Sequence, residues 1–354
     1  MNFPVFKTKI PGKTKKFDLT NSGEVQKYFE YKAGEEIAKI RKYLEKNTFV
    51  AYFLGKKGAG KGTYSNLFAS IFGSDKVGHI SVGDIVREVD LEIKEPKKKK
   101  ELVEFLQKNY RGYHSLEEIL RSQEERSTTK PLLPTEYILA LLKRKIGQMP
   151  KKSLFLDGLP RNLDQVSYSL FFRELIGYRD DPDMFILIDI PESVIDARIK
   201  TRVVCPKCAK SRNTKLLLTS IVKYDEKNKQ FYLCCDDPKC QQARMLPKEG
   251  DELGIEPIRE RLNNDGKLIE QAFSLYGVPK ILLRNSVPVT QAQEMVDDYE
   301  ITPEYVLENV GGGKVKVSTK PWVIKDDAGV ASYSLLAQPV ALGMIKQITE
   351  VLGL

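Results

Sequence analysis

The sequence predicts an α/β fold in which a parallel sheet is flanked by helices and a phosphate-binding loop follows the first strand. Short apolar runs at 49–54, 153–156 and 184–188 are bounded by residues that break regular structure, which is typical of buried strands. Segments compatible with helices separate these runs, and strands that alternate with helices form parallel sheets. The third observation is a glycine- and lysine-rich stretch at 55–63, directly after the first run.

Length and composition fit one main α/β domain with insertions and extensions. The chain has 354 residues, of which 41% are hydrophobic, and this is enough for a sizeable core. A formal net charge of +9 favours anionic partners, and nucleotide phosphates alone can account for it. No apolar run approaches the roughly 18 residues that a membrane span requires, and residues 1–18 have no apolar signal core. We therefore expect a soluble cytoplasmic protein without a membrane partner.

The remaining elements follow from periodicity and from turn-forming residues. Residues 22–46 place apolar side chains at helical intervals between charges, which predicts an amphipathic helix that packs on the domain. We expect a helix over 64–72, with its N-terminus facing the glycine-rich stretch, and a short second strand over 78–81. Four consecutive lysines at 97–100 are too charged for a core and predict an exposed helical insertion.

The stretch 55–63 has the chemistry of a loop that binds a polyphosphate. Glycines let successive backbone N–H groups turn inward around phosphate oxygens, and the ammonium group of Lys61 can reach the terminal phosphates. In the usual pattern a serine or threonine follows the lysine directly, whereas here Gly62 intervenes before Thr63. The alternative interpretation is a surface turn. The residues expected to bind ATP are Gly58, Ala59, Gly60, Lys61, Gly62, Thr63 and, from a later motif, Arg202.

The order of motifs resembles that of the adenylate kinase (nucleoside monophosphate kinase) family. The GxxGxGKGT loop comes first, followed by strings similar to HISTGDLLR at 79–87 and to LDGFPR at 156–161, and the resemblance continues to about residue 290. It implies an enzyme of nucleotide biosynthesis that transfers a phosphoryl group from ATP to a nucleoside monophosphate, with magnesium as cofactor. AMP is the preferred acceptor, so that ATP and AMP give two ADP. We expect a monomer with no nucleic-acid partner.

The resemblance also assigns an acceptor site. Arg87 and Arg161 would grip the acceptor phosphate, because a planar guanidinium can donate two hydrogen bonds to phosphate oxygens. Gln165 would face the edge of the base, while Val82 stands where adenylate kinases usually have threonine. The complete expected set is Val82, Arg87, Leu132, Leu133, Gly158, Arg161, Gln165 and Arg261.

Charge neutralisation is expected to drive the reaction, and no strong base is needed because the attacking group is itself a phosphate oxygen. By resemblance, Arg198 and Arg202 belong to the helix that enters a mobile lid, and Arg261 to the helix that leaves it. Asp157, at the end of a buried strand, would hold magnesium through its waters, with Asp84 also associated with the ion. The expected catalytic residues are Lys61, Arg161, Arg198, Arg202 and Arg261.

All five cysteines lie between residues 205 and 240, which indicates a local metal site and not a disulfide framework. A CPxC knuckle followed by a second cysteine cluster across a hairpin is typical of a zinc ribbon. We prefer Cys205, Cys208, Cys235 and Cys240 as ligands of a structural zinc that stabilises a small lid. The alternatives are Cys234 in place of Cys235, an aspartate as one ligand, or buried thiols without metal.

We divide the chain into an N-terminal extension with its helix (1–47), a kinase core (48–300) and a C-terminal extension (301–354). The core contains a helical monophosphate-binding insertion at 81–135 and a zinc-ribbon-like lid at 203–255. Its last strand is either 281–284 or 322–325, and the first is preferred for its distance after Arg261.

Two other functions remain open. Because relatives directed at uracil and cytosine also lack the threonine at the Val82 position, a UMP/CMP-type kinase is the first. The second is a nucleic-acid-binding P-loop ATPase whose zinc ribbon and lysines hold RNA or DNA, an interpretation favoured by basic and aromatic neighbours such as Lys223 and Tyr224. That interpretation leaves the motifs at 79–87 and 156–165 unexplained.

Overall fold

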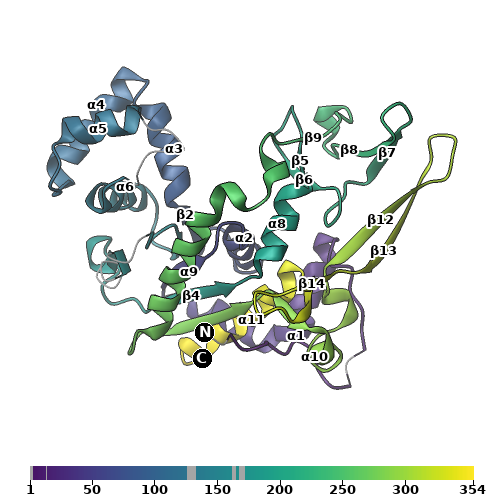
Figure 1. Cartoon of the computed structure of the whole chain (residues 1–354). Coiled ribbons are helices and arrows are strands. Elements are labelled where there is room, and N and C mark those ends of the chain that lie inside the picture. The colour runs from purple at the N-terminus through teal and green to yellow at the C-terminus, as the bar shows by residue number, and fades with distance from the viewer. Residues whose placement is uncertain (1–2, 13, 126–132, 162–164, 167–171) are drawn as a thin grey trace.

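The computed structural model describes residues 3–12, 14–125, 133–161, 165–166 and 172–354. At its centre lies a parallel sheet whose strands run in the order β10-β4-β1-β3-β2 across the described chain (Figure 1). These strands are β1 (Val50–Gly55), β2 (Val77–Ser81), β3 (Ser153–Asp157), β4 (Asp183–Asp189) and β10 (Lys280–Arg284). With helices on both faces, the sheet confirms the predicted P-loop α/β fold and the preferred last strand.

The central strands bury both of their faces, which explains why they could be recognised as apolar runs. Along β1, Ala51 and Phe53 enter the core on one face, whereas Tyr52 and Leu54 enter the core on the other. The first face is covered by α1 (Ser22–Tyr43), α2 (Lys61–Phe72) and α11 (Ala337–Val351), and the second by α3 (Val82–Glu92), α6 (Thr135–Gly147) and α9 (Arg259–Ser274). The predicted N-terminal amphipathic helix is thus part of the core and ends at residue 43.

The insertion after β2 is helical, as predicted, and lies on the opposite side of the molecule from the lid (Figure 1). It contains α4 (Pro96–Asn109) and α5 (Leu116–Glu124). Leu102 and Leu106 of α4 are fully buried, while Lys97, Lys98 and Lys100 are exposed. The lysine run therefore forms the solvated side of an amphipathic helix.

The lid follows α8 (Glu192–Lys200) and consists mainly of short strands. These are β5 (Arg202–Val204), β6 (Ser211–Asn213), the hairpin of β7 (Ile221–Asp225) and β8 (Gln230–Cys234), and β9 (Leu246–Pro247). Three single-turn helices complete it: η1 (Pro238–Cys240), η2 (Asp251–Leu253) and η3 (Glu256–Ile258). Its small core contains Val203, Leu233 and Met245 together with buried cysteines. So little apolar surface cannot by itself stabilise a domain.

The chain beyond β10 forms a second small sheet and a long arm. This part contains β11 (Ser286–Pro288), α10 (Val289–Met295), η4 (Asp298–Glu300), β12 (Pro303–Asn309), β13 (Val315–Pro321), β14 (Val323–Lys325) and β15 (Ala331–Ser334). The arm, defined as the β12–β13 hairpin, runs beside the lid (Figure 1), where the N–H of Tyr305 donates to the carbonyl of Lys215 at 2.8 Å. A two-stranded hairpin is marginal alone, so these contacts stabilise the arm.

After the arm, α11 returns to the sheet and packs against α1, α2 and β10. Met344 and Ile345 are fully buried there. A buried polar cluster fastens the N-terminal segment to the same region: Lys32 Nζ lies 2.6 Å from Asp297 Oδ2, and Tyr28 donates to Glu300 at 2.6 Å. The division at residues 47 and 300 stays a prediction, although both terminal helices share one core with the sheet.

Replacing Ile345 by alanine should lower the free energy of unfolding by about 2 to 4 kcal/mol, because a cavity would open under the sheet. Denaturant unfolding followed by circular dichroism measures this change. The matched control is Val317→Ala on the arm, where the side chain is 44% exposed and the effect should stay below about 0.5 kcal/mol. Equal effects at the two positions would contradict a core role for α11.

Candidate active site

The loop between β1 and α2 has a backbone that only glycine fits well. Gly58 and Gly60 have φ values of 88° and 92°, a region that side chains with a Cβ rarely occupy. A Cβ at Gly55 would lie 3.1 Å from Cβ of Ile188 on β4, so the start of the loop is pressed against the sheet. Because Gly60 precedes α2 without a side-chain cap, the first N–H groups of this helix are available for an anion.

Lys61 and Asp157 lie together at the carboxyl edge of the sheet. Parallel pairing of β1 with β3 sets Phe53 beside Asp157, and Lys61 begins the helix that follows β1. The Nζ atom of Lys61 donates to the carbonyl of Gly55 at 2.8 Å and lies 3.6 Å from Oδ1 of Asp157. A partly exposed carboxylate beside a phosphate loop is a suitable oxygen ligand for magnesium or its waters.

Two predicted acceptor arginines converge at the start of α3. A Cβ placed on Gly83 would lie 3.6 Å from an Nη atom of Arg87 and 3.6 Å from an Nη atom of Arg161. Arg161 Nε donates to the carbonyl of Gly158 at 2.9 Å. Arg87 forms an ion pair with Asp84, one turn away on α3. Both guanidinium groups therefore reach the same end of the helix, where an anion is favoured.

The structure places the other predicted acceptor residues deeper in the protein. Gln165 is 2% exposed; its Oε1 accepts the N–H of Arg161 at 2.7 Å, and its Nε2 donates to Thr135 at 2.9 Å. Val82 is 1% exposed and packs beside Gly158. Leu133 is half-buried near the start of α6, and Leu132 lies outside the described residues. These contacts make Gln165 a support for the backbone of Arg161.

The lid arginines differ in how close they come to the loop. The prediction that Arg198 and Arg202 share one helix is wrong, because α8 ends at Lys200 and Arg202 is the first residue of β5. Arg198 on α8 donates to the carbonyl of Gly58 at 3.3 Å, and burial lowers the pKa of its guanidinium. Arg202 donates to both carboxylate oxygens of Asp251 at 2.6 and 2.5 Å, and these hydrogen bonds raise its pKa. Arg261 is exposed in the first turn of α9. Arg198 is thus already at the loop, while Arg202 is engaged by an acidic residue of the lid.

Sequence reasoning missed an acidic contact to the loop. Asp265 accepts the backbone N–H of Lys57 at 2.9 Å, and burial raises the pKa of its carboxyl group. The spacing of four residues between Arg261 and Asp265 puts both on one face of α9, and this is the signal that could have found it.

Four cysteine side chains in the described part of the lid form a cluster suited to a metal. The Sγ atoms of Cys205, Cys208, Cys235 and Cys240 all lie within 4.8 Å of one another, and those of Cys208 and Cys235 are 3.7 Å apart. A tetrahedral zinc with Zn–S bonds of about 2.3 Å separates its sulfur ligands by about 3.8 Å, so these residues fit zinc. Cys234 is buried next to the cluster without belonging to it.

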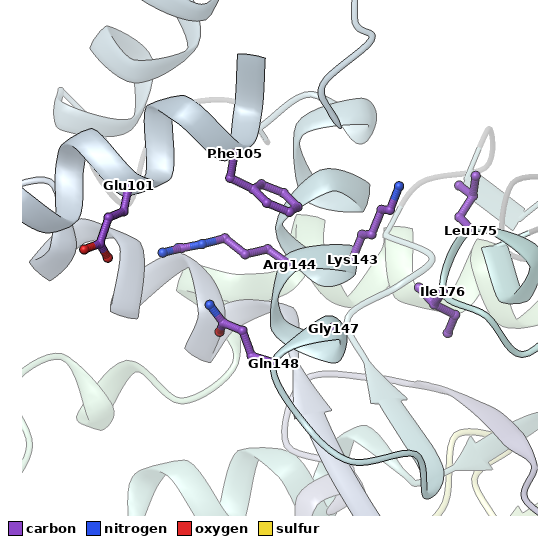
Figure 2. A pocket seen from close by; sticks show the side chains of 8 residues that line it. All are labelled: Glu101, Phe105, Lys143, Arg144, Gly147, Gln148, Leu175 and Ile176. Atoms are coloured by element: carbon purple, nitrogen blue, oxygen red, sulfur yellow. The ribbon is translucent and has the colours of Figure 1, made fainter. Parts of the chain in front are cut away.

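A separate cavity of about 460 Å³ lies between α4, α6 and residues 175–176, and Figure 2 shows Phe105 and Arg144 directed toward it. Arg144 forms an ion pair with Glu92, in which Nη1 lies 2.6 Å from Oε2. None of the predicted phosphate-binding side chains lines this cavity. We therefore place the candidate active site at the loop, where glycine geometry, Lys61 and the arginines come together.

No helix in the described residues is both long and apolar enough to cross a membrane.

Three known proteins that are similar to this chain are named as adenylate kinases. The adenylate kinase of Petrotoga mobilis is 33% identical over 225 residues, which cover 63% of this chain and 83% of that protein. The adenylate kinase of Thermotoga neapolitana is 29% identical over 233 residues, 66% of this chain and 87% of the relative. A probable chloroplastic adenylate kinase 6 of Arabidopsis thaliana is 26% identical over 242 residues, 67% of this chain and 68% of the relative.

No protein-family model matches the chain. Each of these relatives is nevertheless matched over more than half of this chain, and the name adenylate kinase denotes a phosphotransferase that acts on a nucleoside monophosphate. Since the Petrotoga mobilis protein is 33% identical and 83% of its length is matched, the chain belongs to the adenylate kinase family.

Proposed function

We propose that the protein transfers the γ-phosphoryl group of magnesium-bound ATP to AMP and so forms two ADP. The observation that supports the proposal is that the residues expected to bind the donor and acceptor phosphates follow neighbouring strands. Parallel pairing of β2 with β3 sets Ser81 beside Asp157, and α3 begins directly after Ser81. Arg87 of α3 and Arg161, which follows β3, therefore lie next to the strand end that faces Lys61. Transfer between two phosphates requires the two phosphate sites to be close in this way.

The chemistry asks for charge neutralisation and in-line placement more than for covalent help. Lys61 would contact the β- and γ-phosphates of the donor, and Arg87 and Arg161 would hold the acceptor phosphate. Magnesium, when bound near Asp157, would neutralise further charge on the donor phosphates. The attacking oxygen belongs to a phosphate, so no side chain has to remove a proton. We also propose that a monomer is the active form.

Lid closure would complete the donor site. Arg198 already contacts the loop, whereas Arg202 would have to exchange Asp251 for a phosphate oxygen as the lid moves. A carboxylate and a phosphate can each accept two hydrogen bonds from one guanidinium, so Arg202 can bind in a bidentate manner in either state. Arg261, which is exposed in this structure, would contact the transferred phosphoryl group only after the lid closes.

The first test is Lys61→Met, which removes the ammonium group and keeps the length of the side chain. Turnover with ATP and AMP should fall at least about a hundredfold, because a lost charge on the phosphoryl oxygens costs roughly 3 kcal/mol in the transition state. Lys76→Met serves as the control, since Lys76 is exposed before β2, at the other end of the sheet. Near-normal turnover of a folded Lys61→Met protein would contradict the mechanism.

The acceptor is tested with AMP, CMP, UMP and GMP in a coupled assay. AMP should have the highest kcat/KM, by about tenfold to a hundredfold. When another base is bound, a polar group at its buried edge is left without a hydrogen-bond partner, and this costs about 1 to 3 kcal/mol. A faster reaction with UMP or CMP would show that AMP is not the preferred acceptor, and it would leave the proposed phosphoryl transfer to a nucleoside monophosphate standing.

We also propose that the cysteine cluster holds a structural zinc. Elemental analysis should find about one zinc per chain, which Cys205→Ser combined with Cys208→Ser should remove. The lid should then lose its hydrogen-exchange protection before the core does, since its own apolar core is small. Cys234→Ser is the matched control and should keep the metal. Loss of zinc from this control, or no transition metal in the parent protein, would contradict the ligand set.

A further inference from the structure

One carboxylate from the C-terminal part of the chain contacts the ATP-binding loop. We infer that Asp327 is a positioning residue: it joins Lys56 of the loop to the N-terminus of α8 and thereby aligns the loop with the helix that carries Arg198. The inference rests on the proposed binding of ATP at this loop. Asp327 belongs to none of the motifs that predict the site, and it lies outside the predicted kinase core.

The turn that presents Asp327 is built by its neighbour Asp326. Oδ1 of Asp326 accepts the backbone N–H groups of Ala328 and Val330 at 3.0 and 2.8 Å. Its Oδ2 accepts Nη2 of Arg284 at 3.0 Å. Because Arg284 is the last residue of β10, the turn is attached to the central sheet, and the neighbouring carboxylate is held in place before any ligand binds.

Both carboxylate oxygens of Asp327 are used. Oδ2 accepts Nζ of Lys56 at 2.8 Å, and Oδ1 accepts the backbone N–H of Glu192 at 2.7 Å. Glu192 opens α8, whose preceding residue Pro191 provides no side-chain acceptor. Asp327 therefore acts as an N-cap supplied from a remote segment, and a negative charge is favourable at this end of a helix.

Lys56 is held from two sides. Its Nζ atom also lies 3.0 Å from Oε1 of Glu192, and its side chain is 16% exposed. Burial by itself lowers the pKa of Lys56, but the hydrogen bonds to Asp327 and Glu192 outweigh this and raise it. The ammonium group of Lys56 is consequently held in place within the loop by two carboxylates.

The helix that Asp327 caps packs directly on the loop. A Cβ at Gly58 would lie 3.3 Å from Cγ2 of Ile195, and Arg198 donates to the carbonyl of Gly58. A second contact joins α8 to β14 of the second small sheet, since Ser193 Oγ donates to the carbonyl of Lys325 at 2.7 Å. A small shift of α8 would therefore move the loop and Arg198 together, and this would affect the donor nucleotide more than the acceptor.

The test compares Asp327→Ala and Asp327→Asn with the parent protein. Asp327→Ala should raise both the KM for ATP and the Kd of adenylyl imidodiphosphate about fivefold, as expected for a partly exposed charge-assisted hydrogen bond. The KM for AMP should stay unchanged. Asp327→Asn keeps an acceptor for the N–H of Glu192 and should recover part of the loss. Hydrogen exchange at residues 190–194 should be faster in the alanine variant, because the cap is gone.

Glu308→Ala is the matched control, because Glu308 lies on the arm, forms an ion pair with Lys316 of the same hairpin, and is half exposed. It should leave both ATP constants unchanged. Unchanged or tighter analogue binding by a folded Asp327→Ala protein would overturn the inference. If that variant does not fold, Lys56→Met replaces it and should raise the analogue Kd with the AMP constant intact. A parent protein that binds the analogue without transferring phosphoryl would refute the proposed reaction, while the affinities would still decide the role of Asp327.

Discussion

The rest of the structure depends on one constraint: a short loop must keep its backbone N–H groups directed at a polyphosphate. The sheet restrains one end, where Gly55 has no room for a side chain beside Ile188. The other end becomes α2, which begins at Lys61 and packs into the core. A loop fixed in this way needs little reorganisation when a nucleotide arrives, and preorganised donors are the main source of catalysis in phosphoryl transfer.

The lid and the central sheet are connected at this loop. The lid has a small core, and its cysteine cluster can supply by metal binding the stability that apolar burial does not provide. The helix α8 connects the lid to the loop, and segments from the C-terminal part of the chain contact both: the arm lies on Lys215, and the turn after β14 reaches Lys56. The segment beyond β10 thus contacts both the lid and the loop.

Local patterns predicted the parts of the structure that leave a local signal. Buried parallel strands appear as apolar runs, the loop as spaced glycines before Lys61, and the cysteine cluster as paired cysteines. Contacts between distant segments leave no such signal, because their partners are chosen by the packed fold. Lys56 and Asp327 are 271 positions apart, and neither has a neighbour pattern that points to the other. For the same reason, the pairing of Arg202 with Asp251 and the return of α11 to the core could not be foreseen.

The most direct measurement is calorimetric titration with a compound in which ATP and AMP share one phosphate chain, so that a single ligand must occupy both anion sites. If the loop and the arginines at the start of α3 form one continuous site, the compound should bind at one molecule per chain. Its affinity should exceed that of ATP by at least about a hundredfold, because the second contact becomes intramolecular. Two molecules per chain, or an affinity no better than that of ATP, would show that the two anion sites do not form one site for phosphoryl transfer.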